Sequence, residues 1–319
     1  MPKTMSEYAD DYIAHKRAGG VEAYKENMIL RRFIRITLEK HPNATTVTQE
    51  NAEYWSNLTP NESPRNQQLR TGVVQRFSEY LLSRGVASYI YPRTKTVPTQ
   101  FTPYIFTNDE LARIFAASDN CRSPYLPTRC EVASLIFRVL YSTGMRISEA
   151  INLKVRNIDL VQGVIGVYDT KFGKERLLPV DDSLLKRMKS YSKNVLTFAG
   201  PDSPFFPGQN NRHYHPNTIY GMFREFLWQA GISHGGKGAG PRVHDLRHTF
   251  AVHCLRRAVK NGDDLGVMLK YLSVYLGHSS TSATQAYLRL TADMYPDVVC
   301  KVEYNFDVLP DLEVLHEAN

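Results

Sequence analysis

Four short segments in the last two-thirds of the chain carry side chains that together could cut and rejoin a phosphodiester. Two guanidinium groups match paired phosphate oxygens, an ammonium and two imidazoles can move protons, and a phenol can attack phosphorus. Each segment alone is a weak signal, but their order and spacing are hard to obtain by accident. The segments are Thr143-Gly144-Met145-Arg146, Lys171, His244-Asp245-Leu246-Arg247, and Leu276-Gly277-His278 followed by Tyr287.

Tyr287 is the candidate nucleophile. A phenol with a pKa of about 10 is ionised in roughly one part in a thousand at pH 7, so leaving it unactivated costs about 4 kcal/mol. His244 is the candidate general base that offsets this cost, and the two arginines supply a positive field. We expect Tyr271 and Tyr275 to be packing residues, and His248 to take no part in the chemistry.

Lys171 is the candidate acid that protonates the departing oxygen, because nearby arginines and partial burial would lower its pKa. Lys174 is the alternative acid, and otherwise it would contact the phosphate backbone. We expect His278 to hydrogen-bond a nonbridging phosphate oxygen. Glu149 falls one helical turn after Arg146, so it is expected to orient that arginine or the lysine segment.

With these residues, the chain resembles the tyrosine recombinases of the phage integrase family. Members carry an Arg in a T-G-x-R-x-x-E box, a Lys on a β-hairpin, an H-x-x-R box, and L-G-H with a Tyr nine residues on. The resemblance covers roughly residues 105–295 by specific motifs, and residues 1–95 only by general character. The matching positions are Arg146 with Glu149, Lys171-Phe172-Gly173-Lys174-Glu175-Arg176, His244 with Arg247, and His278 with Tyr287.

The resemblance implies a mainly α protein with a small antiparallel β-sheet. A helical, SAM-like core-binding domain and a catalytic domain would close around DNA as a C-shaped clamp. We expect the core-binding domain at residues 1–91, a linker at 92–104 and the catalytic domain at 105–302. Residues 303–319 would form a tail that could be exchanged between protomers.

The implied reaction is attack by Tyr287 on a DNA phosphate, which gives a 3′-phosphotyrosyl enzyme and a free 5′ hydroxyl. A second 5′ hydroxyl then reseals the strand, so neither a cofactor nor a metal is expected. The partners would be double-stranded DNA, further copies in a homotetramer on two sites, and accessory recombination proteins. The biological role would be integration, excision or transposition of a mobile element. The alternatives are a type IB topoisomerase-like relaxase, a protelomerase and an inactive DNA-binding regulator.

Composition agrees with a polyanionic partner, because the net charge is +7 and the isoelectric point is near 9.1. No run of ~18 apolar residues exists, so no membrane span is expected. Cys121, Cys130, Cys254 and Cys300 contain no C-x-x-C pair, which suggests neither a zinc site nor a disulfide framework. A cytoplasmic, nucleoid-associated protein is the simplest expectation.

The apolar periodicity predicts which elements position these residues. Helices are expected over 24–40 and 66–83, with arginines beside their apolar stripes that resemble a DNA-backbone surface. A buried helix through residues 132–140 should end at Gly144. Strands at 164–168 and 176–180 should form a hairpin around Lys171. Further helices are predicted at about 182–194, 216–230, 244–260, 265–276 and 281–290.

Overall fold

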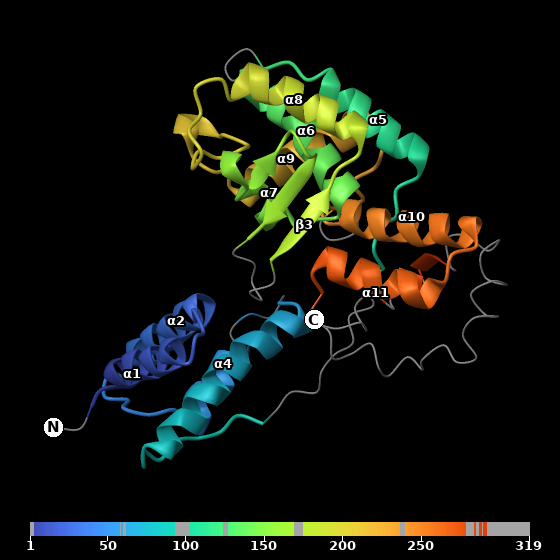
Figure 1. Ribbon diagram of the computed structural model, residues 1–319. Coiled ribbons are helices and arrows are strands. Elements are labelled where there is room, and N and C mark those ends of the chain that lie inside the picture. The colour runs from blue at the N-terminus through green and yellow to red at the C-terminus, as the bar shows by residue number, and fades with distance from the viewer. Residues whose placement is uncertain are drawn as a thin grey trace. The chain divides into compact units, whose positions relative to one another are not determined.

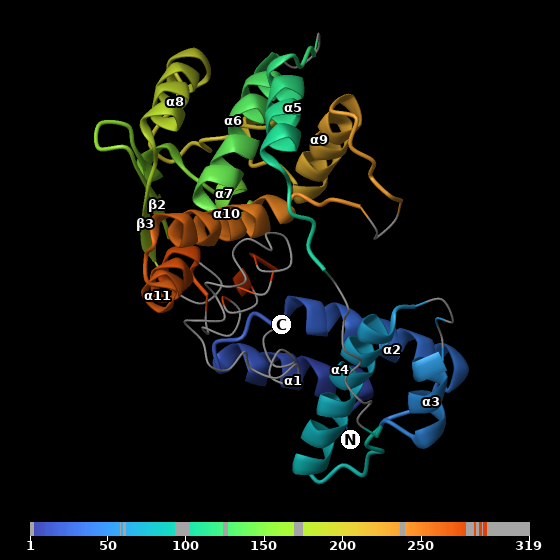
Figure 2. The ribbon, with the colours of Figure 1, turned by 90° about the vertical axis from the view of Figure 1, so that its right-hand side faces the viewer.

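The computed structural model divides the chain into two compact units, residues 1–100 and 101–319. This division falls inside the segment for which the sequence predicts a linker. Figures 1 and 2 show the two units from perpendicular directions, and each unit is described below by itself. The structure describes residues 3–57, 59, 62–92, 102–123, 127–168, 175–236, 240–278, 284, 287, 288, 290 and 291.

The N-terminal unit is a bundle of helices around one apolar core. Leu30, Phe33 and Ile34 from the second helix and Phe77 and Leu81 from the fourth are buried there, as their helical spacing predicts. The predicted helices at 24–40 and 66–83 are confirmed, the second beginning two residues earlier. The helices are α1 (Met5–Ala18), α2 (Tyr24–Lys40), α3 (Gln49–Asn57) and α4 (Pro64–Ser83).

The arginines of this unit do not all face solvent. Arg70 is buried, donates two hydrogen bonds to Glu62 at 3.1 and 2.7 Å, and lies 4.6 Å from the Trp55 ring. Its predicted place on a DNA-backbone surface was therefore wrong: pairing with a carboxylate and an aromatic face lets the charge sit in the core. Arginines 31, 32, 35 and 65 are exposed, as expected for a basic face.

The C-terminal unit is mostly helical. A capping box opens its first helix, because Thr107 and Glu110 each accept a hydrogen bond from the other's backbone N–H. Asp181 and Asp264 cap two later helices through their side chains. The helices are α5 (Asn108–Asp119), α6 (Pro127–Thr143), α7 (Ile147–Ile151), α8 (Asp182–Val195), α9 (Pro216–Gln229), α10 (Asp245–Asn261) and α11 (Leu265–Leu276), with 3₁₀ turns at Val155–Asn157 and Gln209–Asn211.

Helix α6 is the centre of this unit. It packs against α5, α8 and α10, and α10 packs in turn on α11 (Figure 1). Val132, Ile136, Phe137 and Val139 of α6 have almost no exposed surface, because neighbouring helices cover it on several sides. The buried helix ends at Thr143, directly before Gly144, as the sequence predicts. Gly144 and Arg146 of the predicted site follow directly after this buried helix.

A three-stranded antiparallel sheet lies beside α7. The strands β1 (Ile158–Asp159), β2 (Val164–Val167) and β3 (Arg176–Pro179) follow one another in sheet order, and Val167 pairs with Arg176. The predicted strands are confirmed to within one residue, and with them the mainly α fold with a small antiparallel sheet. Residues 169–174, including Lys171 and Lys174, lie outside the described residues.

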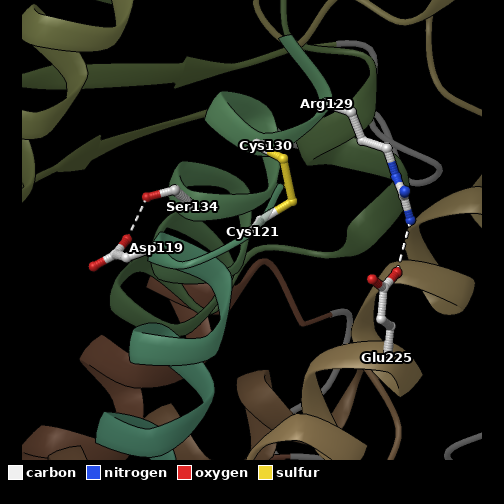
Figure 3. Close-up of a disulfide and its surroundings, with 6 residues drawn as sticks. All are labelled: Asp119, Cys121, Arg129, Cys130, Ser134 and Glu225. Atoms are coloured by element: carbon white, nitrogen blue, oxygen red, sulfur yellow. Dashed lines mark hydrogen bonds and ion pairs between the residues drawn. A yellow bond between two sulfur atoms is a disulfide. The ribbon is translucent and has the colours of Figure 1, made fainter. Parts of the chain in front are cut away.

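A disulfide joins Cys121, just after α5, to Cys130 in the first turn of α6 (Figure 3). The expectation of no disulfide was wrong. The Cα atoms are 5.4 Å apart because α5 and α6 pack side by side, which a search for C-x-x-C spacing does not detect. Ion pairing between Arg129 and Glu225 of α9 also holds the start of α6.

None of the helices in the described ranges is long and apolar enough to cross a membrane.

The helix predicted at 281–290 is covered only in part by the described residues. Residues 284, 287, 288, 290 and 291 are helical, and the other residues of this range lie outside the described ones. The tail at 303–319 also lies outside them.

Candidate active site

The turn after α6 carries the first predicted phosphate ligand. Gly144 has a φ of +59°, a conformation that glycine adopts without strain, and the turn leaves Arg146 at the N-cap of α7. The backbone N–H of Arg146 donates to Glu149 Oε2 at 2.8 Å, and its Nη1 donates to Glu149 Oε1 at 2.9 Å. Glu149 therefore orients Arg146, which was one of the two roles expected for it.

Arg247 connects three of the predicted motifs. Its Nη1 donates to the carbonyl oxygen of Gly144 at 2.8 Å, and its Nη2 donates to that of Leu276 at 2.9 Å. Arg146 Nη2 reaches the next carbonyl, that of Gly277, at 3.2 Å. Segments more than a hundred residues apart in sequence thus meet at two guanidinium groups, as a phosphate site requires.

Glu149 also holds the sheet. Arg176 at the start of β3 donates to its two carboxylate oxygens at 3.2 and 2.7 Å, and both side chains are only 7% exposed. The carboxylate consequently lies between two guanidinium groups, and these positive charges hold the Glu149 pKa below its usual value even though burial opposes them. Arg176 is the first residue after the connection that contains Lys171.

Tyr287 is almost completely buried. Its hydroxyl oxygen is 3.0 Å from Nδ1 of His248. Burial raises the Tyr287 pKa, while the charge of Arg247 and a hydrogen bond from it, together with the charge of Arg146, act to lower it. The hydroxyl is therefore within the positive field that the sequence predicts.

The other two predicted histidines lie beside these residues. His278 stacks nearly parallel on the Tyr287 ring with centroids 6.0 Å apart, and its Nδ1 lies 2.7 Å from Thr284 Oγ1. The His244 ring, just before α10, packs edge-on against His248 at 4.8 Å. His244 is nevertheless an exposed residue.

All three imidazoles are held neutral. Burial, followed by the charges of Arg247 and Arg146, lowers the pKa of His244 to about 4 and of His278 to about 3. Burial, His244 and Arg247 lower the pKa of His248 to about 3. Burial also lowers the Arg247 pKa to about 10, so the guanidinium stays charged at pH 7. The positive charge of the site is therefore carried by its arginines.

The structure brings together five of the six predicted site residues: Arg146, His244, Arg247, His278 and Tyr287.

The sixth, Lys171, lies outside the described residues. Sequence reasoning missed His248, although its position four residues after His244 places both on one helix face, which is a usable signal. Tyr275 is a packing residue as predicted, stacked on Phe250 at 5.6 Å. Tyr271 of α11 was also predicted to be a packing residue, which was wrong, because Tyr271 is 68% exposed.

The described residues contain no group of three His, Cys, Asp or Glu side chains that could hold a metal ion. The pair of histidines around Tyr214 has local roles. Nδ1 of His213 lies 2.7 Å from the carbonyl oxygen of Ile151, and His215 caps α9 by accepting the N–H of Asn217.

Residues 105–294, which include every motif of this site, match the phage integrase family. The chain belongs to this family. Its members are DNA strand-exchange enzymes, and this tyrosine recombinase acts in site-specific recombination. A tyrosine recombinase of Thermosipho africanus is 26% identical over 93% of this chain and 98% of its own. Tyrosine recombinase XerA of Pyrococcus furiosus is 33% identical over 52% of each chain.

The fold also matches solved recombinases. A lambda integrase tetramer bound to a Holliday junction aligns with 88% of this chain and 78% of the integrase chain, with a TM-score of 0.61 at 18% identity. The tyrosine recombinase described here therefore has the integrase fold in addition to the family's sequence motifs.

Proposed function

We propose that this recombinase cuts one DNA strand by attack of Tyr287 on the scissile phosphate. The attack forms a 3′-phosphotyrosyl bond and releases a 5′ hydroxyl. A 5′ hydroxyl from the partner site then attacks the phosphotyrosine, which restores the DNA backbone and frees the enzyme. The bond energy is kept in the protein linkage, so the reaction requires neither ATP nor a metal ion.

The observation that carries this proposal is the junction of motifs at two guanidinium groups. Arg247 donates to the carbonyls of Gly144 and Leu276, and Arg146 donates to that of Gly277, so three carbonyls from two of the boxes fix both guanidinium groups. These groups would bind the nonbridging oxygens and stabilise the charge that gathers in the pentavalent transition state. Tyr287 interacts with Arg247, so its hydroxyl would lie near a phosphate that this arginine binds.

The remaining roles follow from chemistry and sequence. His278 would hydrogen-bond a nonbridging oxygen from its place on the Tyr287 ring. Lys171 would protonate the leaving 5′ oxygen. His244 lies at the exposed edge, where it could face the DNA.

We further propose that four copies assemble on two DNA sites, with each protomer cutting one strand. The lambda integrase tetramer on a Holliday junction is the structural precedent. The two units of the chain would clamp the duplex, and residues 303–319 would contact a neighbouring protomer. Movement of a mobile element by integration, excision or transposition is the biological role proposed.

Covalent trapping on DNA tests the proposal. A nicked suicide substrate from the element's own ends is incubated with wild type and with Tyr287→Phe, with and without EDTA. We expect an EDTA-resistant protein–DNA adduct that maps to Tyr287 and is absent from the variant. An adduct that persists in Tyr287→Phe would assign another nucleophile.

Two assays distinguish the alternatives. A four-way junction is resolved by a recombinase, whereas relaxation of a supercoiled plasmid without junction resolution indicates a type IB topoisomerase. Hairpin-ended products would indicate a protelomerase. Tight DNA binding with no adduct would indicate a regulator and would overturn the proposed reaction.

A further inference from the structure

We propose that His248 is a catalytic residue, which accepts the proton of the Tyr287 hydroxyl when Tyr287 attacks the phosphate. This inference rests on the proposed function, because it assigns a partner to the nucleophile of that reaction. The sequence instead pointed to His244 as the base. His248 is chosen here because it touches the reacting oxygen.

The contact is direct. Nδ1 of His248 lies 3.0 Å from the Tyr287 hydroxyl oxygen, and the two ring centroids are 5.6 Å apart. A general base must lie within about 2.6–3.2 Å of the atom from which it takes a proton. The His244 ring instead packs against the His248 ring at 4.8 Å. His248 is therefore the imidazole at the hydroxyl.

The position of His248 is fixed by α10. The residue after Arg247 must lie about 100° further around the helix, so the two side chains flank the tyrosine from neighbouring faces. Arg247 is anchored at Gly144 and Leu276, which prevents α10 from rotating without breaking the phosphate site. The first turn of α10 therefore positions both the arginine that would bind the phosphate and the histidine that would deprotonate the nucleophile.

The chemistry requires the tautomer of His248 that carries its proton on Nε2, leaving Nδ1 as an acceptor. The groups that face it are His244 and Arg247 on its own helix, with His278 and Tyr287 from the following segments. Burial, followed by the positive field of these groups, keeps His248 neutral. A phosphate anion bound by the arginines offsets that field, so the imidazole becomes a better base when the substrate is present.

Each bond is accounted for in this step. The Tyr287 O–H bond breaks and its proton passes to His248 Nδ1, while the phenolic oxygen forms a bond to phosphorus. The bond from phosphorus to the 5′ oxygen breaks, and that oxygen takes a proton from the general acid. In the resealing step, the attacking 5′ hydroxyl gives its proton back to the general acid as its oxygen bonds to phosphorus, and the proton on His248 returns to Tyr287 as the phosphotyrosyl bond breaks.

Two substitutions separate proton transfer from positioning. His248→Asn places an amide oxygen near the Nδ1 position, so it can accept the hydrogen bond but cannot take the proton at neutral pH. His248→Ala removes both functions and leaves room for a small base. Single-turnover formation of the covalent adduct is measured on the nicked suicide substrate at pH 7, with and without added imidazole.

We expect both variants to form the adduct about 100-fold more slowly than wild type. Imidazole should accelerate His248→Ala and leave His248→Asn unchanged. His253→Ala is the matched control, because His253 lies on the same helix with Nδ1 2.9 Å from the Tyr141 hydroxyl. Near-wild-type rates for His248→Asn, or a slow His248→Ala that imidazole does not accelerate, would overturn the inference.

Thermal unfolding and DNA affinity show whether the variants fold. If His248→Ala does not fold, 3,5-difluorotyrosine at position 287 replaces the rescue experiment, because its more acidic phenol needs less help from a base. The rate ratio of wild type to His248→Asn should then shrink, and an unchanged ratio would overturn the inference. Failure of the proposed function is distinct, since wild type itself would then give no Tyr287 adduct.

Discussion

Arg176 and Glu149 form a buried salt bridge with two hydrogen bonds, at 3.2 and 2.7 Å, that joins the β-sheet to the arginine turn. Glu149 binds Arg146 with the same carboxylate. Arg176 also lies against the αL turn after α11: a Cβ atom on Gly277 would be 3.1 Å from its Nη1. The Arg176 guanidinium therefore contacts Glu149 of the first arginine box and lies close to Gly277 of the L-G-H box. Arg176 is also the first residue of β3, the strand that follows the Lys171 segment.

Arg176→Gln should destabilise the protein by about 3 kcal/mol, because it removes a partner from a buried carboxylate. Glu149→Gln combined with it should cost less than the sum of the two single changes. Urea unfolding measures both effects. Arg156→Gln, which breaks an exposed ion pair with Asp202, is the control and should cost under about 1 kcal/mol. Strictly additive losses at residues 149 and 176 would contradict the coupling.

Asp245 should make the protein less stable as the pH rises from about 4 to 6. It is 1% exposed, and burial raises its pKa to about 6, although the N–H of Arg242 donates to Oδ2 at 2.7 Å. The folded state then binds more protons than the unfolded state in this window, so the free energy of unfolding falls with pH.

Asp245→Asn keeps an acceptor for the Arg242 N–H and removes the ionisation. At pH 7 the variant should be more stable than wild type by on the order of 2 kcal/mol, and the difference should vanish below about pH 4. Urea midpoints from pH 3.5 to 7.5 measure this difference, in which the opposite contributions of the site histidines cancel. A variant that is less stable than wild type at pH 7 would show that the charge is needed in the folded state.

Gly144→Ala should be far more damaging than an alanine at another left-handed glycine. A Cβ atom at Gly144 would lie 2.5 Å from Phe250 Cδ1 and 2.7 Å from Leu276 Cδ2. At Gly262, with a φ of +80°, it would meet nothing within 4 Å. We expect about 1 kcal/mol for Gly262→Ala from backbone strain alone, and more than about 3 kcal/mol for Gly144→Ala. Thermal unfolding compares them, and similar losses would contradict the steric argument.

Reduction of the disulfide should lower stability without lowering DNA cleavage. Cys121 and Cys130 are nine residues apart, so the closed loop contributes about 2.5 kcal/mol through the unfolded chain. Cys130 is separated from the end of α6 at Thr143 by about 20 Å of helix. Dithiothreitol should shift the urea midpoint of wild type but not of the Cys121→Ala, Cys130→Ala double variant. Loss of adduct formation on reduction would instead indicate coupling along α6.

Lys171 and Lys174 can be separated by the chemistry of the leaving group. A DNA substrate with sulfur at the 5′ bridging position releases a thiolate, which needs no proton. Lys171→Met should slow cleavage of ordinary DNA by about 100-fold or more and cleave the sulfur substrate at nearly the wild-type rate. Lys174→Met should have little effect on either. The reverse pattern would assign Lys174 as the acid.

Short-range patterns determined much of this protein. The apolar spacing of α6 and the strand-like composition of β2 are local properties, so the sequence predicted the end of α6 and the bounds of β2 to within one residue. The order of the motifs also predicted that Arg146 and Arg247 share one site, and the structure brings the two side chains together. Such features depend on residues only a few positions apart in the chain, so they can be predicted from the sequence.

Contacts between distant segments were decided by the tertiary structure. Arg70 faces inward because Glu62 and Trp55 surround it, and its helical position alone gives no sign of this. Cys121 meets Cys130 because two helices pack side by side.

The choice between His244 and His248 has the same origin. His244 is the N-cap of α10 and His248 lies in its first turn, so helical periodicity does not distinguish them. The packing of the Tyr287 segment on that helix brings His248, with a separation of 3.0 Å, to the hydroxyl. Sequence spacing can propose which residues share a face, but only three-dimensional packing determines which of them meets a group from elsewhere in the chain.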